Sequence, residues 1–546
     1  MNLNRLKNGI SGWFIISTFI IILIILPNLN IMLRVFDDTS ENWAHIQKYL
    51  LPSYALNTMI IVFFTGLLTL LIGLVSAWLV TAYEFPLRKF FSWGLILPLA
   101  IPAYIGAYTY QGLLNYTGVI QSFFRNHLGF GEGVNYFDFM NLKGSIFIFT
   151  MFLYPYVFII TKSFLKKISA SIIESAKLLG KSNLEIFFQI VLPISRTAIV
   201  GSVSLVILEV INDYGVVKYY GISTFSTAIF KTWFGMGDTT SAIRLAALLM
   251  LFVFVLLSTE RFLRGRKKYS YSSTKIKPMQ REKLTGTKKY LATFFSSSIF
   301  ILGFVIPVLQ LIHWGYLTYS KIIDIDFIMM TVSSLSVSLL ASILVIVIAL
   351  IVGNYVRLNN NILSKLYSKA VTIGYSIPGA VTAIGVITLL IFVDRQLRNF
   401  YNSMDFISGN LLLSTSLFML VFAYIIRFLA IGYQSIDSGY ERIGNKFTEA
   451  SRLLGENSLS TFFKVDLPMI KPAIYSGILL VFIELIKELP LTLILRPFNF
   501  NTLATKSFEY ANDEMIHEAS IAALIIIAIS FLAIVSMNQL FKKEAT

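Results

Sequence analysis

Twelve long apolar stretches limit what this chain can fold into. A helix that crosses a bilayer needs about 20 mostly apolar residues, and each of these stretches is close to that length or longer. Of 546 residues, 56% are hydrophobic and 14% are charged, whereas about 25% are charged in an ordinary soluble domain. This composition excludes a soluble enzyme and a disordered chain, and it predicts an all-α membrane protein with twelve transmembrane helices. The predicted spans are 12–33, 53–80, 92–114, 144–162, 194–215, 241–262, 291–313, 328–355, 367–393, 410–431, 470–493 and 518–540.

The positions of the basic residues predict the orientation of these spans. Residues 261–289 contain eleven Lys or Arg and one acid, Glu282, and residues 162–181 contain five lysines. Short loops rich in Lys and Arg stay on the cytoplasmic side, so twelve alternating spans place both loops and both termini in the cytoplasm. The net charge of +16 is therefore a topology signal, with attraction to membrane lipid as a second effect. We expect no nucleic acid partner.

One motif occurs twice, and its two copies are separated by 275 positions, the difference between 449 and 174. The segment from Glu174 to Gly180 has its counterpart in the segment from Glu449 to Gly455, and a Leu-Pro pair follows each of them. The same offset relates many other residues, so the chain contains two homologous six-span halves. An even number of spans per half makes the repeats parallel, with a pathway expected at their interface. The predicted division is 1–262 for the first half, 263–290 for a basic cytoplasmic linker and 291–546 for the second half.

Each copy of the motif predicts a short helix in a cytoplasmic loop. Apolar residues recur there with a period of about 3.6, Ser171 and Glu174 are spaced as a capping box, and Gly180 is suited to end the helix in a left-handed conformation. A second amphipathic stretch follows and ends at Pro193. An exposed amphipathic helix of this kind is suited to dock into a groove on a partner protein.

This repeated loop resembles the signature loop of ABC importer permeases. The pattern is Glu-Ala-Ala, three residues, Gly, nine residues and Ile-x-Leu-Pro, and the chain departs from it at Ser175, Ser451 and Val465. The resemblance implies a type I importer permease in which each short helix is a coupling helix, seated in a cleft of an ATPase subunit. The residues that carry this expectation are Glu174, Ala176, Gly180, Leu192 and Pro193 in the first copy, and Glu449, Ala450, Gly455, Leu467 and Pro468 in the second.

The chain itself shows no sign of catalytic chemistry. Gly180-Lys181-Ser182 resembles the end of a phosphate-binding loop, but the position that needs the first Gly is Ser175, and no strand is predicted before it. There is no Cys, and the four His are scattered without metal-ligand spacing. We therefore expect no cofactor and no enzymatic activity, and we expect separate subunits to hydrolyse ATP.

The segments after the fifth and eleventh spans make the resemblance more specific. The segment 209–238 and its counterpart 484–505, with the doubled six-span layout, look like the fused permeases of ferric-iron ABC importers. This resemblance implies transport of Fe(III) by alternating access in the bacterial cytoplasmic (inner) membrane. It also implies two partners, a homodimeric ABC ATPase on the cytoplasmic face and a periplasmic or lipid-anchored substrate-binding protein outside.

Two pairs of acids near the ends of matched spans are candidate pathway residues. Residues four apart share one helix face, buried carboxylates in a membrane are costly, and hard cations prefer oxygen ligands. Nearby tyrosines, including Tyr219 and Tyr220, could add transient oxygen ligands, although no firm metal site is predicted. Alternatively, Lys487 and Lys218 could neutralise the acids, or the acids could lie in exposed loops or contact the binding protein. The candidates are Glu209, Asp213, Tyr214, Glu484 and Glu488.

Other functions are compatible with parts of this sequence. Related permeases share the loop motif, so the substrate could instead be thiamine, a phosphonate or a polyamine. An ion-coupled secondary transporter with twelve spans would leave the paired loop motif without a purpose. A membrane-embedded enzyme would need a nucleophile–base pair or a ligand cluster, and the sequence presents neither.

Overall fold

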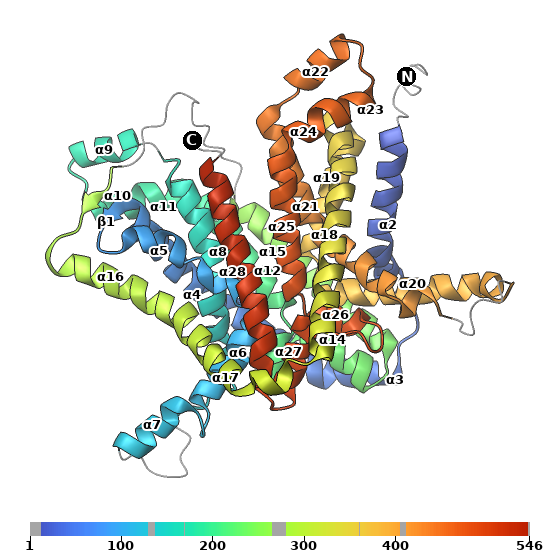
Figure 1. Ribbon diagram of the computed structural model, residues 1–546, viewed down its shortest axis with the longest axis horizontal. Helices are drawn as coiled ribbons and strands as arrows, with labels where there is room; N and C mark the ends of the chain where they lie inside the picture. The colour runs from blue at the N-terminus through green and yellow to red at the C-terminus, as the bar shows by residue number, and fades with distance from the viewer. Residues whose placement is uncertain are drawn as a thin grey trace.

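The computed structural model describes residues 12–128, 137–168, 170–264, 280–359, 361–403 and 411–543, and it is a bundle of helices (Figure 1). Within these residues the strands are confined to one parallel pair, β1 (Tyr83–Glu84) and β2 (Glu282–Lys283). The predicted all-α class is confirmed.

The elements of the first half run from α2 to α15. They are α2 (Gly12–Arg34), α3 (Glu41–His45), η1 (Ile46–Leu50), α4 (Leu51–Ala82), α5 (Arg88–Gly94), η2 (Leu97–Ala100), α6 (Ala103–Leu114), α7 (Val119–Leu128), α8 (Leu142–Leu165), α9 (Ala170–Leu178), α10 (Asn183–Ile186), η3 (Phe187–Val191), α11 (Leu192–Ile194), α12 (Arg196–Asn212), α13 (Gly215–Tyr219), α14 (Phe225–Phe230), η4 (Lys231–Gly235) and α15 (Thr239–Arg264).

The elements of the second half run from α16 to α28. They are α16 (Gly286–Phe300), η5 (Ile301–Val305), α17 (Ile306–Ile322), α18 (Ile325–Leu358), α19 (Ile362–Ile373), η6 (Gly374–Ser376), α20 (Gly379–Ser403), η7 (Leu413–Thr415), α21 (Leu417–Ile443), α22 (Lys446–Leu453), α23 (Ser458–Thr461), η8 (Phe462–Asp466), α24 (Leu467–Met469), α25 (Lys471–Lys487), α26 (Pro490–Leu495), α27 (Leu503–Asn512) and α28 (Ala519–Lys543).

The helices account for the predicted number of spans. Nine helices in the described residues are long and apolar enough to cross a membrane, and the number rises to twelve if each of three bent helix pairs is one span. The bends are 91° between Arg88–Ala100 and Ala103–His127, 71° between Asn183–Ile194 and Arg196–Asn212, and 72° between Ser458–Met469 and Lys471–Lys487.

Two spans predicted as continuous helices are broken at matched prolines. Proline disfavours the helical conformation of the residue before it. Ile101 accordingly has φ −100° and ψ 111°, and Ile377 has φ −84° and ψ 125°. New helices start directly after Pro102 and Pro378, at α6 and α20. The predicted spans 92–114 and 367–393 are therefore each interrupted by a break.

The first helix of each half packs against the other half. Helix α2 contacts α18, α19 and α20 of the second half, while α16, η5 and α17 contact α5, η2, α6 and α8 of the first half. The two halves are thus interlocked by an exchange of their first helices, which also pack on their own halves, α2 on α15 and α17 on α28. A large apolar core, which includes residues of both halves, runs through the interface.

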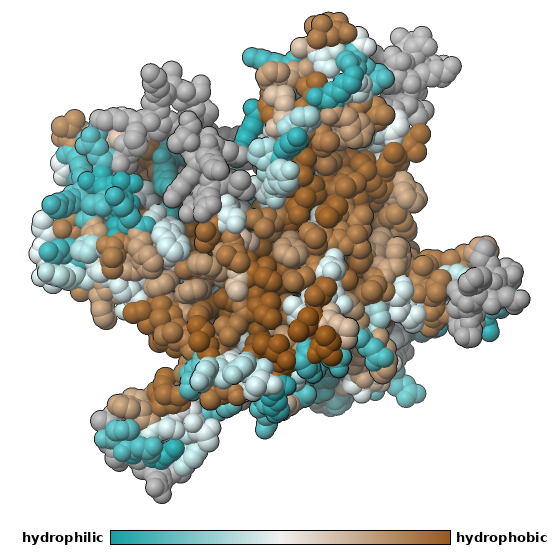
Figure 2. Space-filling view, in the orientation of Figure 1, coloured by the Kyte–Doolittle hydropathy of each residue, from teal (hydrophilic) through white to brown (hydrophobic). Residues whose placement is uncertain are grey.

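The short helices of the repeated loops lie on one face of the bundle. Helices α9 and α22 stand apart at the top of Figure 1, on the face where α2 begins and α28 ends. Helices α3, α7, α14 and α27 lie toward the opposite face. Figure 2 shows an apolar surface between these two faces, as expected for a lipid-facing belt.

Candidate functional site

A cavity of about 100 Å³ at the interface of the halves brings together all four predicted acids. Glu209 lies in the last turn of α12 and Asp213 directly follows that helix, and Glu484 and Glu488 have the matched places at the end of α25. Both helices end in an extended residue, so the second acid of each pair is a C-cap rather than a helical residue. The cavity is lined by residues near both proline breaks and by α8, α12, α21 and α25.

The two acids of the second half form ion pairs. The Nε of Arg427 lies 3.4 Å from a carboxylate oxygen of Glu488, and these side chains are only 4% and 7% exposed. Glu488 also accepts a hydrogen bond from the backbone N–H of Leu491 at 3.0 Å. Lys487 lies 3.0 Å from Glu484, which confirms that an ion pair with Lys487 neutralises one of the acids.

The two acids of the first half have hydrogen-bond donors instead of cations. The hydroxyl of Tyr375 donates to Glu209 at 2.5 Å, and the backbone N–H of Val216 donates to Asp213 at 2.8 Å. Lys218, the other cation that we considered for these acids, is exposed and lines a separate pocket with Lys231. With all four acids ionised, the cavity lining carries four negative and two positive charges.

The proline break before α20 joins the halves at this cavity. The backbone N–H of Gly379 donates to the Oδ1 of Asn212 at 2.6 Å, and Arg427 donates to the carbonyl oxygen of Ile377 at 3.1 Å. A Cβ atom at Gly379 would lie 3.1 Å from both Arg427 and Glu488. The break therefore supplies backbone partners to two residues that line the cavity, Asn212 and Arg427, and a glycine permits the close approach.

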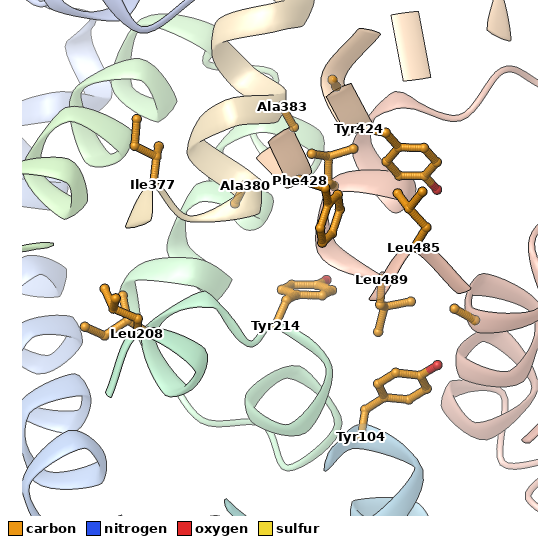
Figure 3. Close-up of a cluster of buried hydrophobic side chains, with 14 of the residues drawn as sticks. Tyr104, Leu208, Tyr214, Ile377, Ala380, Ala383, Tyr424, Phe428, Leu485 and Leu489 are labelled. Atoms are coloured by element: carbon orange, nitrogen blue, oxygen red, sulfur yellow. The ribbon is translucent and has the colours of Figure 1, made fainter. Parts of the chain in front are cut away.

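The predicted tyrosines lie outside this cavity. Tyr214 is near Phe428 and Leu489 in Figure 3, but its ring stacks on Phe230 with 3.7 Å between centroids, and it does not line the cavity. Tyr219 and Tyr220 are also absent from the lining, where three other tyrosines stand instead, Tyr104, Tyr156 and Tyr375. In the described part of the chain no three His, Cys, Asp or Glu are grouped to hold a metal ion. The acids are thus a polar lining, without the geometry of a resident metal site.

Sequence reasoning missed Arg427, the buried cation of the cavity. The signal was present, because an arginine inside the predicted span 410–431 is costly in a membrane and points to a buried partner. Asn212 and Tyr375 carried no such signal, because their roles depend on the break at Pro378, which the apolar length of the span concealed.

The repeated loops fold alike on the opposite side from α3 and α14. Gly180 has φ +78° and Gly455 has φ +89°, so both end their helices in the predicted left-handed conformation. Helix α9 begins at Ala170, which places Ser171 inside its first turn and not at its cap. The capping box is instead at the start of α10, where Ser182 and Glu185 exchange hydrogen bonds between side chain and backbone.

Each loop presents a pair of leucines to its surroundings. Leu178 and Leu179 are 89% and 82% exposed, and the matched Leu453 and Leu454 are 89% and 86% exposed. Each short helix is fixed below by small buried side chains, Ala176 in one copy and Ser451 in the other. The remaining motif residues follow one pattern, with Glu174, Glu449, Ala450, Pro193 and Pro468 exposed and Leu192 and Leu467 partly buried at the start of α11 and α24.

Comparison with known proteins matches both halves of the chain. The family described as "Binding-protein-dependent transport system inner membrane component" matches residues 4–266 and 325–545. The chain is 26% identical to the Fe(3+)-transport system permease protein FbpB 2 of Haemophilus influenzae, with 87% of each chain covered. It is 21% identical to the ferric transport system permease protein FbpB of Actinobacillus pleuropneumoniae, over 86% of this chain and 69% of that one. The maltose/maltodextrin transport system permease protein MalF of Vibrio vulnificus is 32% identical over 25% of this chain and 26% of its own.

Proposed function

Because this chain belongs to the family of binding-protein-dependent transport system inner membrane components, we propose that it is the permease subunit of an ATP-driven importer of Fe(III). The pathway lies between the halves and opens alternately to each side. Separate ATPase subunits supply the energy, and a substrate-binding protein, periplasmic or lipid-anchored, delivers the metal from outside. Both termini and the two loops that carry α9 and α22 lie on the cytoplasmic side of the membrane.

Coupling to the ATPase is supported by the two exposed leucine pairs. Apolar side chains that project from a short helix fit a hydrophobic groove on a partner, and large exposed apolar groups mark such contacts. Leu178 and Leu179 repeat in Leu453 and Leu454 with nearly equal exposure. Two equivalent leucine pairs fit two equivalent grooves, and a homodimeric ATPase offers one such groove on each subunit. When ATP closes that dimer, α9 and α22 approach each other and the halves rock about their interface.

The observation that carries the proposal for the cargo is the charge of the central cavity. Four carboxyl groups from matched positions of the two halves line one cavity with two cationic side chains, so the lining is negative in excess when all four acids are ionised. A cleft lined by an excess of one sign attracts ions of the opposite sign, so the lining favours a cation over an anion such as a phosphonate. Glu209 and Asp213 accept hydrogen bonds but form no ion pair within the described residues, so no cation of the chain competes there with a hard cation.

Iron, among the cations, is supported by the relatives that match both halves. Two relatives that cover at least 86% of this chain are named as ferric permeases, whereas the maltose relative covers 25%. The cavity acids do not form a cage, and transient contacts of this kind suit a cargo that must leave again. Thiamine and polyamines are also cations, and the experiment must separate them from iron.

Uptake in a strain that lacks this chain tests the proposal. We expect loss of radiolabelled Fe(III) uptake, with unchanged uptake of thiamine, spermidine and a phosphonate. The chain with Glu209→Gln and Asp213→Asn should restore membrane levels and ATPase association but not iron uptake, because two negative charges of the cavity are removed. Unchanged iron uptake in the deletion strain, with no other iron route induced, would overturn the assignment of the cargo. If the chain purifies from cells with no ATPase subunit attached, the assignment of ATP as the energy source is overturned.

A further inference from the structure

The two coupling helices are attached to the bundle in different ways. Beneath α22, Arg357 at the end of α18 lies 3.0 Å from Asp466, and both are buried. Thr448 of α22 donates to Asp466 at 2.7 Å and accepts a hydrogen bond from Arg357. The matched residues beneath α9 are all apolar, namely Ala82, Ile173 and Val191. A buried charged network therefore lies beneath the second coupling helix, whereas the side chains at the matched positions of the first half are apolar.

The linker supplies the first coupling helix with a polar attachment. We call residues 282–284 the linker strap. Glu282 and Lys283 pair with Tyr83 and Glu84 as parallel strands, and the N–H of Leu284 donates to the carbonyl oxygen of Glu84 at 3.0 Å. The strap is thereby joined to the end of α4. Its residues lie between the two stretches that match the family, so the attachment is a feature of the join between the halves.

Glu282, the one acid of the basic segment 261–289, reaches both short helices of the first loop. One of its carboxylate oxygens lies 3.1 Å from the Nζ of Lys177 in α9 and 3.0 Å from the Nδ2 of Asn183 at the start of α10. These two hydrogen bonds hold the pKa of Glu282 below its ordinary value of 4.5. The folded-state pKa is lowered, so the contact is fully present at neutral pH and is lost only as the pH falls through that lowered value.

The strap also connects this loop to the second half. Helix α16 begins at Gly286, two residues after the strap, and it packs against α5 of the first half. A displacement of α9 is therefore transmitted through Glu282 to α16, the helix of the second half that packs against α5.

We propose that the linker strap positions the first coupling helix, with Glu282 as the positioning residue that holds α9 and α10 to the end of α4 and to the start of the second half. This inference rests on the proposed docking of α9 into an ATPase. The strap takes the place of the buried network of the second half. It makes the first coupling helix move together with α16.

Spin labels test this arrangement directly, because the chain contains no Cys. Cysteines at Leu178 in α9 and Lys89 in α5 carry the labels, and the full chain is measured in lipid nanodiscs. Glu282→Ala should broaden the distance distribution, while Lys283→Ala, an exposed neighbour in the strap, should not. About 1 M salt should broaden the wild-type distribution, because it screens an exposed ion pair. The charge exchange Lys177→Glu with Glu282→Lys should restore the narrow distribution.

Uptake measurements show whether the position of α9 matters for coupling. In cells that carry the variant in place of the native gene, Glu282→Ala should lower uptake of the native substrate about two- to fivefold, the size expected from one exposed ion pair and one hydrogen bond. The amount of ATPase recovered with the chain should not change. If Glu282→Ala inserts poorly, Glu282→Gln removes the charge with little change of shape.

The outcomes separate this inference from the proposed function. An unchanged label distribution in Glu282→Ala would overturn the strap, whatever the cargo is. A broadened distribution with full uptake would also overturn it as a positioning device. If wild-type chains carry no iron but the label result holds and uptake of another substrate falls, the iron assignment fails and the strap stands.

Discussion

Substitution of one charged residue in the central cavity should change the free energy of unfolding strongly, because these charges are buried. Removing one partner of a buried ion pair leaves an uncompensated charge and costs about 3–5 kcal/mol. Arg427→Met should therefore lower the unfolding midpoint of the purified chain markedly, and Arg427→Met with Glu488→Gln should recover most of the loss. Lys487→Met, at a more exposed pair, should cost about 1 kcal/mol or less. Equal losses in all three variants would contradict the pairing of Arg427 with Glu488.

The network beneath α22 offers a second test at this scale, because the other half shows what can replace it. Asp466→Val alone leaves Arg357 buried without its partner and should cost about 3–5 kcal/mol in stability. Replacing all three residues by their first-half counterparts should recover much of that loss, since well-packed apolar residues often substitute for a buried ion pair. Thermal unfolding of the two purified variants measures the difference. The triple exchange is Arg357→Ala, Thr448→Ile and Asp466→Val.

At the scale of elements, the two coupling helices should bind the ATPase through their leucines. Leu178→Asp with Leu179→Asp should abolish recovery of the ATPase with the chain, and the matched change at Leu453 and Leu454 should do the same. The bundle should stay intact, because these side chains are already exposed. Phe498→Asp is the control, since Phe498 is 96% exposed but belongs to the α26–α27 segment on the opposite face. Normal recovery of the ATPase from the leucine variants would remove these helices from the interface.

The elements also show what the sequence could and could not reveal. The matched glycines, Gly180 and Gly455, predicted the ends of α9 and α22, because a left-handed helix end has a local signature. The breaks at Pro102 and Pro378 were missed, because a count of apolar residues does not register one proline. The four acids were found by their spacing and by the cost of burying a carboxylate in a membrane. Tyr375 and Asn212 reach the cavity only through tertiary structure.

Pro378 itself should matter for transport through the break that it imposes. Pro378→Ala allows Ile377 to become helical, which would withdraw the backbone N–H of Gly379 from Asn212 and the carbonyl of Ile377 from Arg427. We expect reduced uptake with normal ATPase recovery, measured in cells that carry the variant. Pro193→Ala is the control, because this proline is exposed in the first repeated loop. It should affect ATPase recovery more than it affects the cavity.

At the scale of the whole molecule, neither half should be stable alone. The first helix of each half packs on the other half, so the fragments 1–262 and 291–546 each lack a helix that covers their core. We expect each fragment expressed alone to be degraded, and the two expressed together to purify as a complex. Accumulation of either fragment by itself, resistant to protease, would contradict the exchange of first helices. Hydropathy could not reveal this exchange, because apolar length says nothing about which helix is the neighbour.

The exchange of first helices also fixes the order in which the helices can pack during synthesis of the chain. Helix α2 ends at Arg34, but its partners in the second half begin with α18 at Ile325. At roughly 5–20 residues per second, α2 emerges about 15–60 s before those partners exist. During that interval the nascent first half must keep the partner-facing side of α2 among lipids or against the insertion machinery. The chain therefore completes its first half only after α18 to α20 of its second half have been made, and a ribosome that stalls between Arg264 and Ile325 would leave a product for the membrane proteases.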